Sequence, residues 1–153
     1  MDYKNIVSRE KFLQFIKVGD MESFGVLGVG STDLNIEYSP ESNTYKWVTQ
    51  KNGKTITTGY EITSGVEQFV HKDDPLFTSI DKLRRKLASG SDATGQIINV
   101  YVYEASGDRP TSAPAEQFDI SIEFNSYGGS SEDPLQIGYT INYNGTPEEG
   151  TAT

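Results

Sequence analysis

The chain has 153 residues, the size of one domain with a substantial hydrophobic core, and we expect a single domain over 1–153. It contains no cysteine, which excludes disulfides and thiolate metal sites. With 13 Lys and Arg against 22 Asp and Glu, its formal net charge is -9. This charge argues against a protein that binds nucleic acid by neutralising phosphates.

The negative charge is confined to the second part of the chain. Acidic and basic residues balance up to Lys86, and Arg109 is the only basic residue after it. Such asymmetry indicates a polarised surface or a partner of complementary charge. The more common explanation is an acidic face that is simply exposed to solvent. The N-terminal segment mixes charged and apolar residues, and no segment approaches the length of a membrane span, so we expect folding in a cytoplasm and no membrane partner.

Hydrophobic periodicity predicts a mainly β protein with one helix. The first two strands are expected over 11–18 and 33–38. A hairpin is expected over 44–58, because Asn52-Gly53 is typical of a two-residue type I′ turn between twisted strands. Its arms carry few apolar residues, so we expect it to project from the domain and Trp47 to meet another molecule. The alternative is that Trp47 closes the domain's own core.

A further strand is expected over 60–70, and a helix follows over 75–89. Asp74 precedes a proline at the first helical position, which is a helix start, and Gly90 is a stop signal. Leucine and isoleucine recur at spacings of three and four on one face, so the helix should cover a sheet. Its outer face carries Lys82, Arg85 and Lys86. We interpret these three as a solvated face or a surface for an acidic partner rather than a nucleic-acid site.

The later part of the chain reads as three strands. In residues 97–104 apolar side chains occur at both odd and even positions, which is typical of a strand that is covered on both faces. Alternation over 117–124 and over 135–143 predicts two half-buried strands. The Gly-, Ser- and Asp-rich segment 125–134 joins them, so we expect an antiparallel hairpin.

No catalytic or cofactor site is predicted. His71 is the only histidine, and its neighbouring acids stand where they would cap the helix. The Asp- and Ser-rich segments 89–95 and 130–133 do not match the spacing of a calcium loop. We therefore expect a protein that is not an enzyme and uses neither a metal nor a cofactor.

Acidic residues recur at even spacing on the polar sides of the predicted strands. If the apolar side of each strand faces the core, these acids share solvent-facing surfaces. A uniformly acidic sheet face would repel a polyanion moving along it, although an ordinary solvated face is the simpler interpretation. The acids are Asp33, Glu37, Glu61, Glu67, Asp119 and Glu123.

A series of short motifs resembles the major tail proteins, or tail tube proteins, of long-tailed phages and prophages of Gram-positive bacteria. The resemblance runs nearly from end to end of the chain and depends on the order and spacing of the motifs. They are NIVSREKFL at 5–13, DDPLF at 73–77, GSDA at 90–93, VYVYE at 100–104, FNSYGG at 124–129 and YTINYNG at 139–145, with Pro147, Gly150 and Thr151.

The resemblance implies a small β-sandwich or barrel-like domain with a flanking helix and a projecting hairpin. It implies hexameric rings that stack into a tube, assembled in the host cytoplasm and located in the virion tail. DNA would pass through as non-specific cargo, and the tape-measure protein and the tail-terminator or tail-tip proteins would be further partners. The residues expected to line the channel are Asp119, Ser121, Glu123, Gln136, Thr140, Asn142, Glu61, Glu67, Asp33 and Glu37. Those expected to stack the rings are Tyr45, Trp47, Val48, Asn52, Gly53 and Ile56.

A second hypothesis from the residues alone is a monomeric β-sandwich module that binds carbohydrate or acts as an adhesin. The residues that would bind the ligand are the exposed aromatic residues Tyr45, Trp47 and Tyr60. It predicts saturable glycan binding by an isolated monomer.

Overall fold

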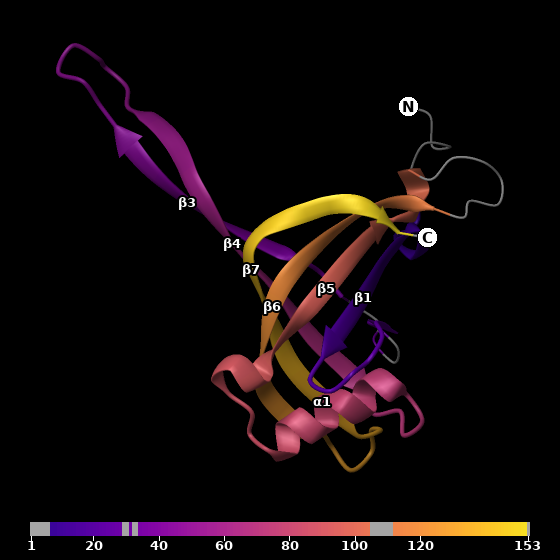
Figure 1. Ribbon diagram of the computed structural model, residues 1–153. Coiled ribbons are helices and arrows are strands. Elements are labelled where there is room, and N and C mark those ends of the chain that lie inside the picture. Colours follow the sequence, from indigo (N-terminus) through magenta and orange to yellow (C-terminus); the bar gives the residue numbers. More distant parts are fainter. Residues whose placement is uncertain (1–6, 29–30, 32–33, 105–111, 153) are drawn as a thin grey trace.

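The computed structural model describes residues 7–28, 31, 34–104 and 112–152. The elements in this part of the chain are β1 (Phe12–Val18), β2 (Gly25–Val26), β3 (Glu37–Tyr45), β4 (Lys54–Phe69), α1 (Pro75–Arg85), β5 (Thr94–Tyr101), β6 (Ala113–Gly128) and β7 (Gln136–Ala152). The strands form one antiparallel sheet in the order β2-β1-β5-β6-β7-β4-β3, with α1 beside it (Figure 1). The predicted mainly β class with one helix is confirmed.

The sheet curves strongly, so that strands distant in the sheet order meet across its concave side. The Gln14 side chain of β1 donates a hydrogen bond of 3.0 Å to the Tyr143 hydroxyl of β7, although β5 and β6 lie between them. Burial and the Glu116 carboxylate of β6 raise the pKa of Tyr38, which lies on β3, with β7 and β4 between them in the sheet order. The sequence predicted either a β-sandwich or a barrel-like domain. The structure has one continuous curved sheet, which corresponds to the barrel-like form.

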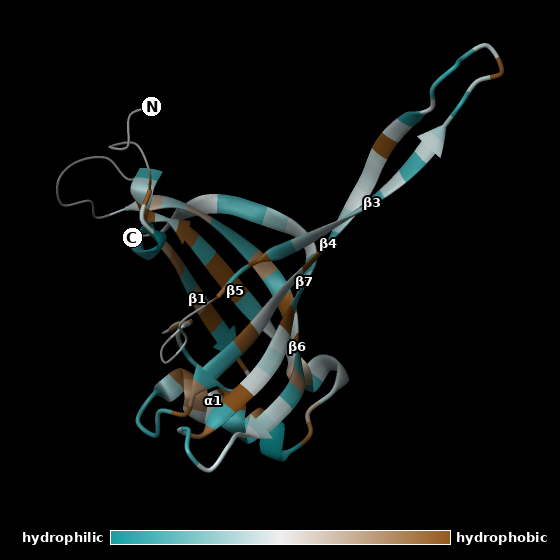
Figure 2. Cartoon of the chain, turned by 180° about the vertical axis from the view of Figure 1, so that it is seen from behind, coloured by the Kyte–Doolittle hydropathy of each residue, from teal (hydrophilic) through white to brown (hydrophobic). Residues whose placement is uncertain are grey.

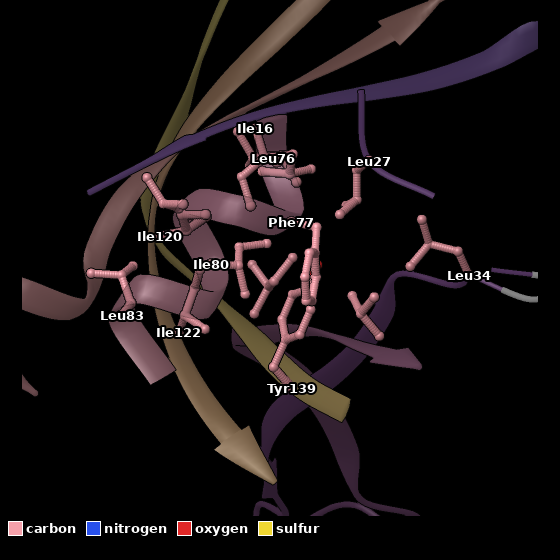
Figure 3. Packing of buried hydrophobic residues seen from close by; sticks show 14 of the residues in the cluster. Ile16, Leu27, Leu34, Leu76, Phe77, Ile80, Leu83, Ile120, Ile122 and Tyr139 are labelled. Atoms are coloured by element: carbon pink, nitrogen blue, oxygen red, sulfur yellow. The ribbon is translucent and has the colours of Figure 1, made fainter. Parts of the chain in front are cut away.

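The hydrophobic core fills the concave side. Ile16 of β1 pairs with Ile97 of β5, and Ile122 of β6 pairs with Ile141 of β7, so one parity of each strand faces inward. Helix α1 closes this side with Leu76, Phe77, Ile80 and Leu83, all buried, and Figure 3 shows them meeting the strand side chains.

Helix α1 begins as predicted and ends four residues earlier. The Asp74 side chain caps the N-terminus by accepting a hydrogen bond of 3.3 Å from the Leu76 N–H. At the other end Leu87, with φ of 52°, adopts a left-handed conformation and stops the helix. Gly90 is also left-handed, but it stands three residues later, at the start of a short 3-10 helix. The Ala88 N–H bonds to the Leu83 carbonyl and the Leu87 N–H to the Arg84 carbonyl, which is a Schellman motif.

Replacing Leu87 with glycine should therefore stabilise the monomer. The left-handed conformation costs a leucine about 1–2 kcal/mol, and the added freedom of the unfolded chain offsets about 0.4–1 kcal/mol of the gain. Leu87 is 83% exposed, so little packing is lost. We expect L87G to raise the free energy of unfolding by about 0.5–1 kcal/mol in urea denaturation. An unchanged or lower value would contradict this explanation of the helix end.

Two early predictions of strand boundaries were wrong. Residues 34–36 are not strand, because side chains bond their backbone carbonyls: Arg9 donates to Leu34 and Ser64 donates to Asn35. The strand predicted over 97–104 is β5, which starts earlier and ends at Tyr101 opposite Phe12, the first residue of β1. Since β1 offers no partner beyond that point, Val102–Glu104 turn into a short 3-10 helix.

The predicted late hairpin is confirmed as the β6–β7 pair, and both strands are longer than expected. The connection is shortened to residues 129–135. β7 continues through a Pro- and Glu-containing segment, where Glu148 and Gly150 pair with Gln117 and Ala115. This segment has no alternating pattern, so only its pairing with β6 makes it a strand.

The β3–β4 hairpin projects away from the curved sheet (Figures 1 and 2). Its predicted two-residue turn is wrong: the last pair is Tyr45 with Lys54, and residues 46–53 form a longer loop. Neither Asn52 nor Gly53 has a positive φ. Gly53 instead permits close packing, because a Cβ there would meet Thr44 Cγ2 at 3.0 Å. Within the loop, the Gln50 N–H bonds to the Trp47 carbonyl.

Candidate functional site

The candidate site is the sheet face opposite the core, which we call the open face. On each strand it carries the residues that alternate with the buried ones, such as Asp119 and Glu123 beside the buried Ile120 and Ile122 of β6. Helix α1 lies on the other side, so it leaves this face uncovered.

The strand registers bring residues from distant parts of the chain into one row on the open face. Thr94, Ser121, Asn142, Thr63 and Glu37 follow one another across β5, β6, β7, β4 and β3. Among them, Thr63 and Thr94 were not predicted. Their prediction would have required the registers of β4 against β7 and of β5 against β6, which the sequence does not display.

Three further rows hold the remaining predicted acids of the sheet body. Glu123 pairs with Thr140, and Glu67 of β4 pairs with Gly138 of β7. Asp119 pairs with Asn144. Five of the predicted acids lie on the open face and are exposed. We call the half of the face over β6, β7, β4 and β3 that carries them the acidic half: Glu37, Glu61, Glu67, Asp119 and Glu123.

The other predicted residues of this set also fall on the open face. By alternation from Ile137, Gln136 lies on it opposite Phe69, and Glu61 lies at the base of the projecting hairpin, just beyond the last β4–β7 pair, Ile62 with Tyr143. Asp33 lies outside the described residues. The registers place one lysine, Lys17 of β1, on this face among the described residues of β1, β5, β6 and β7. The electrostatic character of the acidic half is therefore strongly negative.

A shallow groove crosses the acidic half. Gly65 and Gly138 contribute no side chains to its floor, and Glu37 and Glu67 stand in its wall. Asn125 lies at the groove and donates a hydrogen bond of 2.7 Å to the Thr140 hydroxyl. The groove is polar and open to solvent, so it offers no enclosed site for a small molecule.

An apolar stretch lies on the open face over β2, β1 and β5. Phe15 of β1 pairs with Val26 of β2 and with Ile98 of β5, so the three share the face opposite Ile16. Leu13 lies two residues along β1, on the same side, and Figure 2 shows hydrophobic segments on β1 and β5. We call Leu13, Phe15, Val26 and Ile98 the apolar patch. Leu13 and Val26 are exposed.

The projecting hairpin exposes most of its apolar side chains. Val48 is fully exposed and Trp47 is 68% exposed, which excludes the alternative that Trp47 closes the core. Tyr45 and Ile56 lie diagonally on one face of the ribbon, since their partners are Lys54 and Asn43. The loop at residues 46–53, which we call the hairpin tip, also carries Lys46 and Lys51 and no acid.

The basic side of α1 is partly neutralised by neighbouring acids. Lys82 lies 3.4 Å from Asp20, and Arg85 lies 2.9 Å from Asp81. Lys86 is exposed at the helix end. Sequence reasoning missed Arg84, which bonds to Asp81 at 2.7 Å and stacks over the Tyr127 ring at 3.7 Å.

A buried polar network inside the sheet was also missed. Gln14 donates to Asn99 at 3.2 Å, and Asn99 donates to Glu116 at 3.3 Å. Tyr101 donates a bond of 2.6 Å to the same carboxylate, and burial together with this bond raises the pKa of Tyr101. The sequence contained a signal for this network. Gln14 and Asn99 are polar residues at positions of their strands where the alternating pattern otherwise places apolar side chains.

The described residues hold no cluster of three or more His, Asp or Glu that could bind a metal ion. His71 is exposed, and its carbonyl accepts a hydrogen bond from the Asp74 N–H at the start of α1. None of the described helices has the length and hydrophobicity needed to cross a membrane.

No protein-family model matches the sequence, and no curated protein matches it significantly. Solved structures do resemble the fold. The SPP1 tail tube, a hybrid solid-state NMR and cryo-EM structure, matches with a TM-score of 0.65 at 12% identity, covering 94% of this chain and 78% of that one.

Two further particles contain similar chains. One is in the anti-feeding prophage (AFP) baseplate, with a TM-score of 0.56 at 10% identity over 96% of this chain and 95% of the other. One is in the PVC sheath-tube complex of an extracellular contractile injection system, with a TM-score of 0.55 at 10% identity over 98% and 93%. The chain therefore has the fold found in these tail tube and injection-system structures.

Proposed function

We propose that this protein is the tail tube subunit of a long-tailed phage or prophage of a Gram-positive host, a structural virion protein and not an enzyme. The observation that carries the proposal is the match of 94% of the chain to a subunit of the SPP1 tail tube. The order of short motifs along the sequence supports the same assignment independently of the fold.

The subunits form hexameric rings that stack into a tube, with the acidic half of the open face toward the lumen. Both outer strands of the sheet support association: β3 is exposed along its whole length, and β2 covers only two residues of β1. Unpaired strand edges are a liability in a free monomer, and closing them between subunits removes it.

The acidic half suits a conduit for DNA. At physiological salt, repulsion between like charges persists over roughly 8 Å, so a negatively charged wall keeps the phosphates from adhering. DNA passes as non-specific cargo during ejection. The tape-measure protein occupies the tube before ejection, and tail-terminator or tail-tip proteins bind its ends.

Electron microscopy of the purified protein, concentrated or incubated with tail initiator complexes, tests the proposal. We expect tubes built of stacked six-fold rings with a central channel. Mass spectrometry of purified particles should also identify this chain as an abundant tail component. Its absence from purified particles would refute the proposal, and saturable glycan binding by the monomer would favour the carbohydrate-binding alternative.

A further inference from the structure

We infer that Asn52, in the hairpin tip, is a site of spontaneous deamidation, in which the side-chain amide is converted to a carboxylate. The inference goes beyond the proposed tube function and does not depend on it. Two asparagines in the chain are followed directly by glycine, Asn52 and Asn144. The structure separates them, because Asn52 lies in an exposed loop whereas Asn144 lies in the paired part of β7.

The reaction needs only the chain and water. Hydroxide removes the proton of the Gly53 N–H, and the nitrogen attacks Cγ of Asn52. The N–Cγ bond forms, the Cγ–Nδ2 bond breaks and ammonia leaves, which closes a cyclic succinimide. Water then opens the ring. Cleavage at Cγ leaves aspartate, and cleavage at the backbone carbonyl carbon leaves isoaspartate, whose peptide bond runs through the former side chain.

The hairpin tip leaves both reacting groups free to meet. Asn52 is exposed, and its side chain forms no hydrogen bond or ion pair within the described part of the chain. Gly53 precedes the first paired residue of β4, Lys54, so its nitrogen lies outside the strand ladder. Glycine also carries no side chain that would separate this nitrogen from Cγ. Rotation about the backbone of Asn52 can therefore bring the two atoms together.

The sheet holds the asparagines that would otherwise react in the same way. Asn144 pairs with Asp119 of β6, and ring closure requires a paired residue to leave its extended conformation. Asn125 precedes a serine, and its Nδ2 donates a hydrogen bond of 2.7 Å to the Thr140 hydroxyl. A local opening that costs about 1.4 kcal/mol is enough to slow the reaction about tenfold.

Deamidation changes the hairpin tip in charge and in shape. The tip carries Lys46 and Lys51 and no acid, so a carboxylate at position 52 halves its formal positive charge. Isoaspartate also lengthens the backbone by a carbon atom just before β4. Modified subunits should therefore bind an anion-exchange column more tightly than intact subunits, which allows the two forms to be separated.

Peptide mass spectrometry of the folded, unassembled chain during incubation in mildly alkaline buffer tests the inference. Cleavage after glutamate releases residues 42–61, 124–132 and 133–148, so Asn52, Asn125 and Asn144 are measured in separate peptides of one sample. We expect peptide 42–61 to gain aspartate and isoaspartate at least about tenfold faster than either of the other two. The rate should rise with pH, because the Gly53 nitrogen must lose its proton.

Denaturation and a matched variant separate the effect of the fold from that of the local sequence. In urea, where the ladder is lost, Asn144 should react at a rate close to that of Asn52, because both precede glycine. N52Q keeps an amide on a longer side chain and should abolish the fast reaction, leaving only Asn43, which pairs with Ile56, in peptide 42–61. Equal rates at Asn52 and Asn144 in the folded chain, or a fast reaction that persists in N52Q, would overturn the inference and leave the proposed function intact.

Discussion

Reversing the charge of Asp119 and Glu123 should arrest DNA in the tail while leaving the tube intact. Both side chains are exposed on the acidic half of the open face, so D119K/E123K should change the free energy of unfolding by no more than about 0.5 kcal/mol. Each subunit then presents two lysines where it had two carboxylates. Lysines in the lumen would bind phosphates along the whole tube, and every contact would slow passage.

We expect particles of normal appearance whose infectivity falls about tenfold or more. Triggered ejection in vitro, followed by a DNA-binding dye, should be slower and should recover as salt rises from about 50 to 200 mM, because salt weakens lysine–phosphate contacts. The neutral variant D119N/E123Q should eject more nearly like wild type, since it lacks the attractive charge.

The matched control for this experiment is E132K/D133K, which makes the same change of charge in the exposed loop between β6 and β7. Its infectivity should stay near that of wild type. Equal infectivity of D119K/E123K and the control would remove Asp119 and Glu123 from the channel wall. Loss of tubes in D119K/E123K would instead indicate that these acids lie at a subunit contact.

Truncating Trp47 and Val48 should abolish or severely weaken tube assembly without weakening the monomer. Both side chains project from the hairpin tip, remote from the buried core. Because tryptophan commonly contributes 2 kcal/mol or more at an interface, W47A/V48A should raise the critical concentration of assembly by about thirtyfold or more.

Sedimentation of tubes and circular dichroism of the unassembled protein measure the two effects separately. The melting temperature should match wild type within the error of the measurement. L135A, which truncates another exposed apolar residue outside the hairpin, should assemble normally. Normal tubes formed by a monomer with a much lower melting temperature would show that the hairpin serves the fold of its own subunit instead.

The sequence predicted those features that depend on local pattern. Alternation predicted β6 and β7 because one face of each strand is buried and the other is wet. Asp74 and Pro75 predicted the start of α1, since a capping carboxylate and a fixed φ act within one turn of the chain. The sequence also predicted that the acidic and the apolar side chains of a strand lie on opposite faces, because successive side chains of a strand alternate between the two faces.

Features that depend on pairing could not be predicted in this way. The strand at 146–152 has no alternation and exists because β6 offers it partners. Leu87 stops α1 although leucine is a poor left-handed residue, because the Ala88 and Leu87 N–H groups satisfy the last carbonyls there. An Asn52-Gly53 turn would require strand pairing up to those two residues. The pairing of β3 with β4 ends at Tyr45 and Lys54 instead, so the connection is a longer loop.

The same distinction between local pattern and pairing applies to the candidate site. The sequence by itself determined which residues of each strand face water, and thus that Asp119, Glu123 and Glu67 lie opposite the core. Only the tertiary structure decided that these acids from β6 and β4 share one face and that Leu13 and Val26 form an apolar patch on another part of it. The side-chain period is a property of one strand, whereas register and strand order are set by hydrogen bonds between segments far apart in the chain.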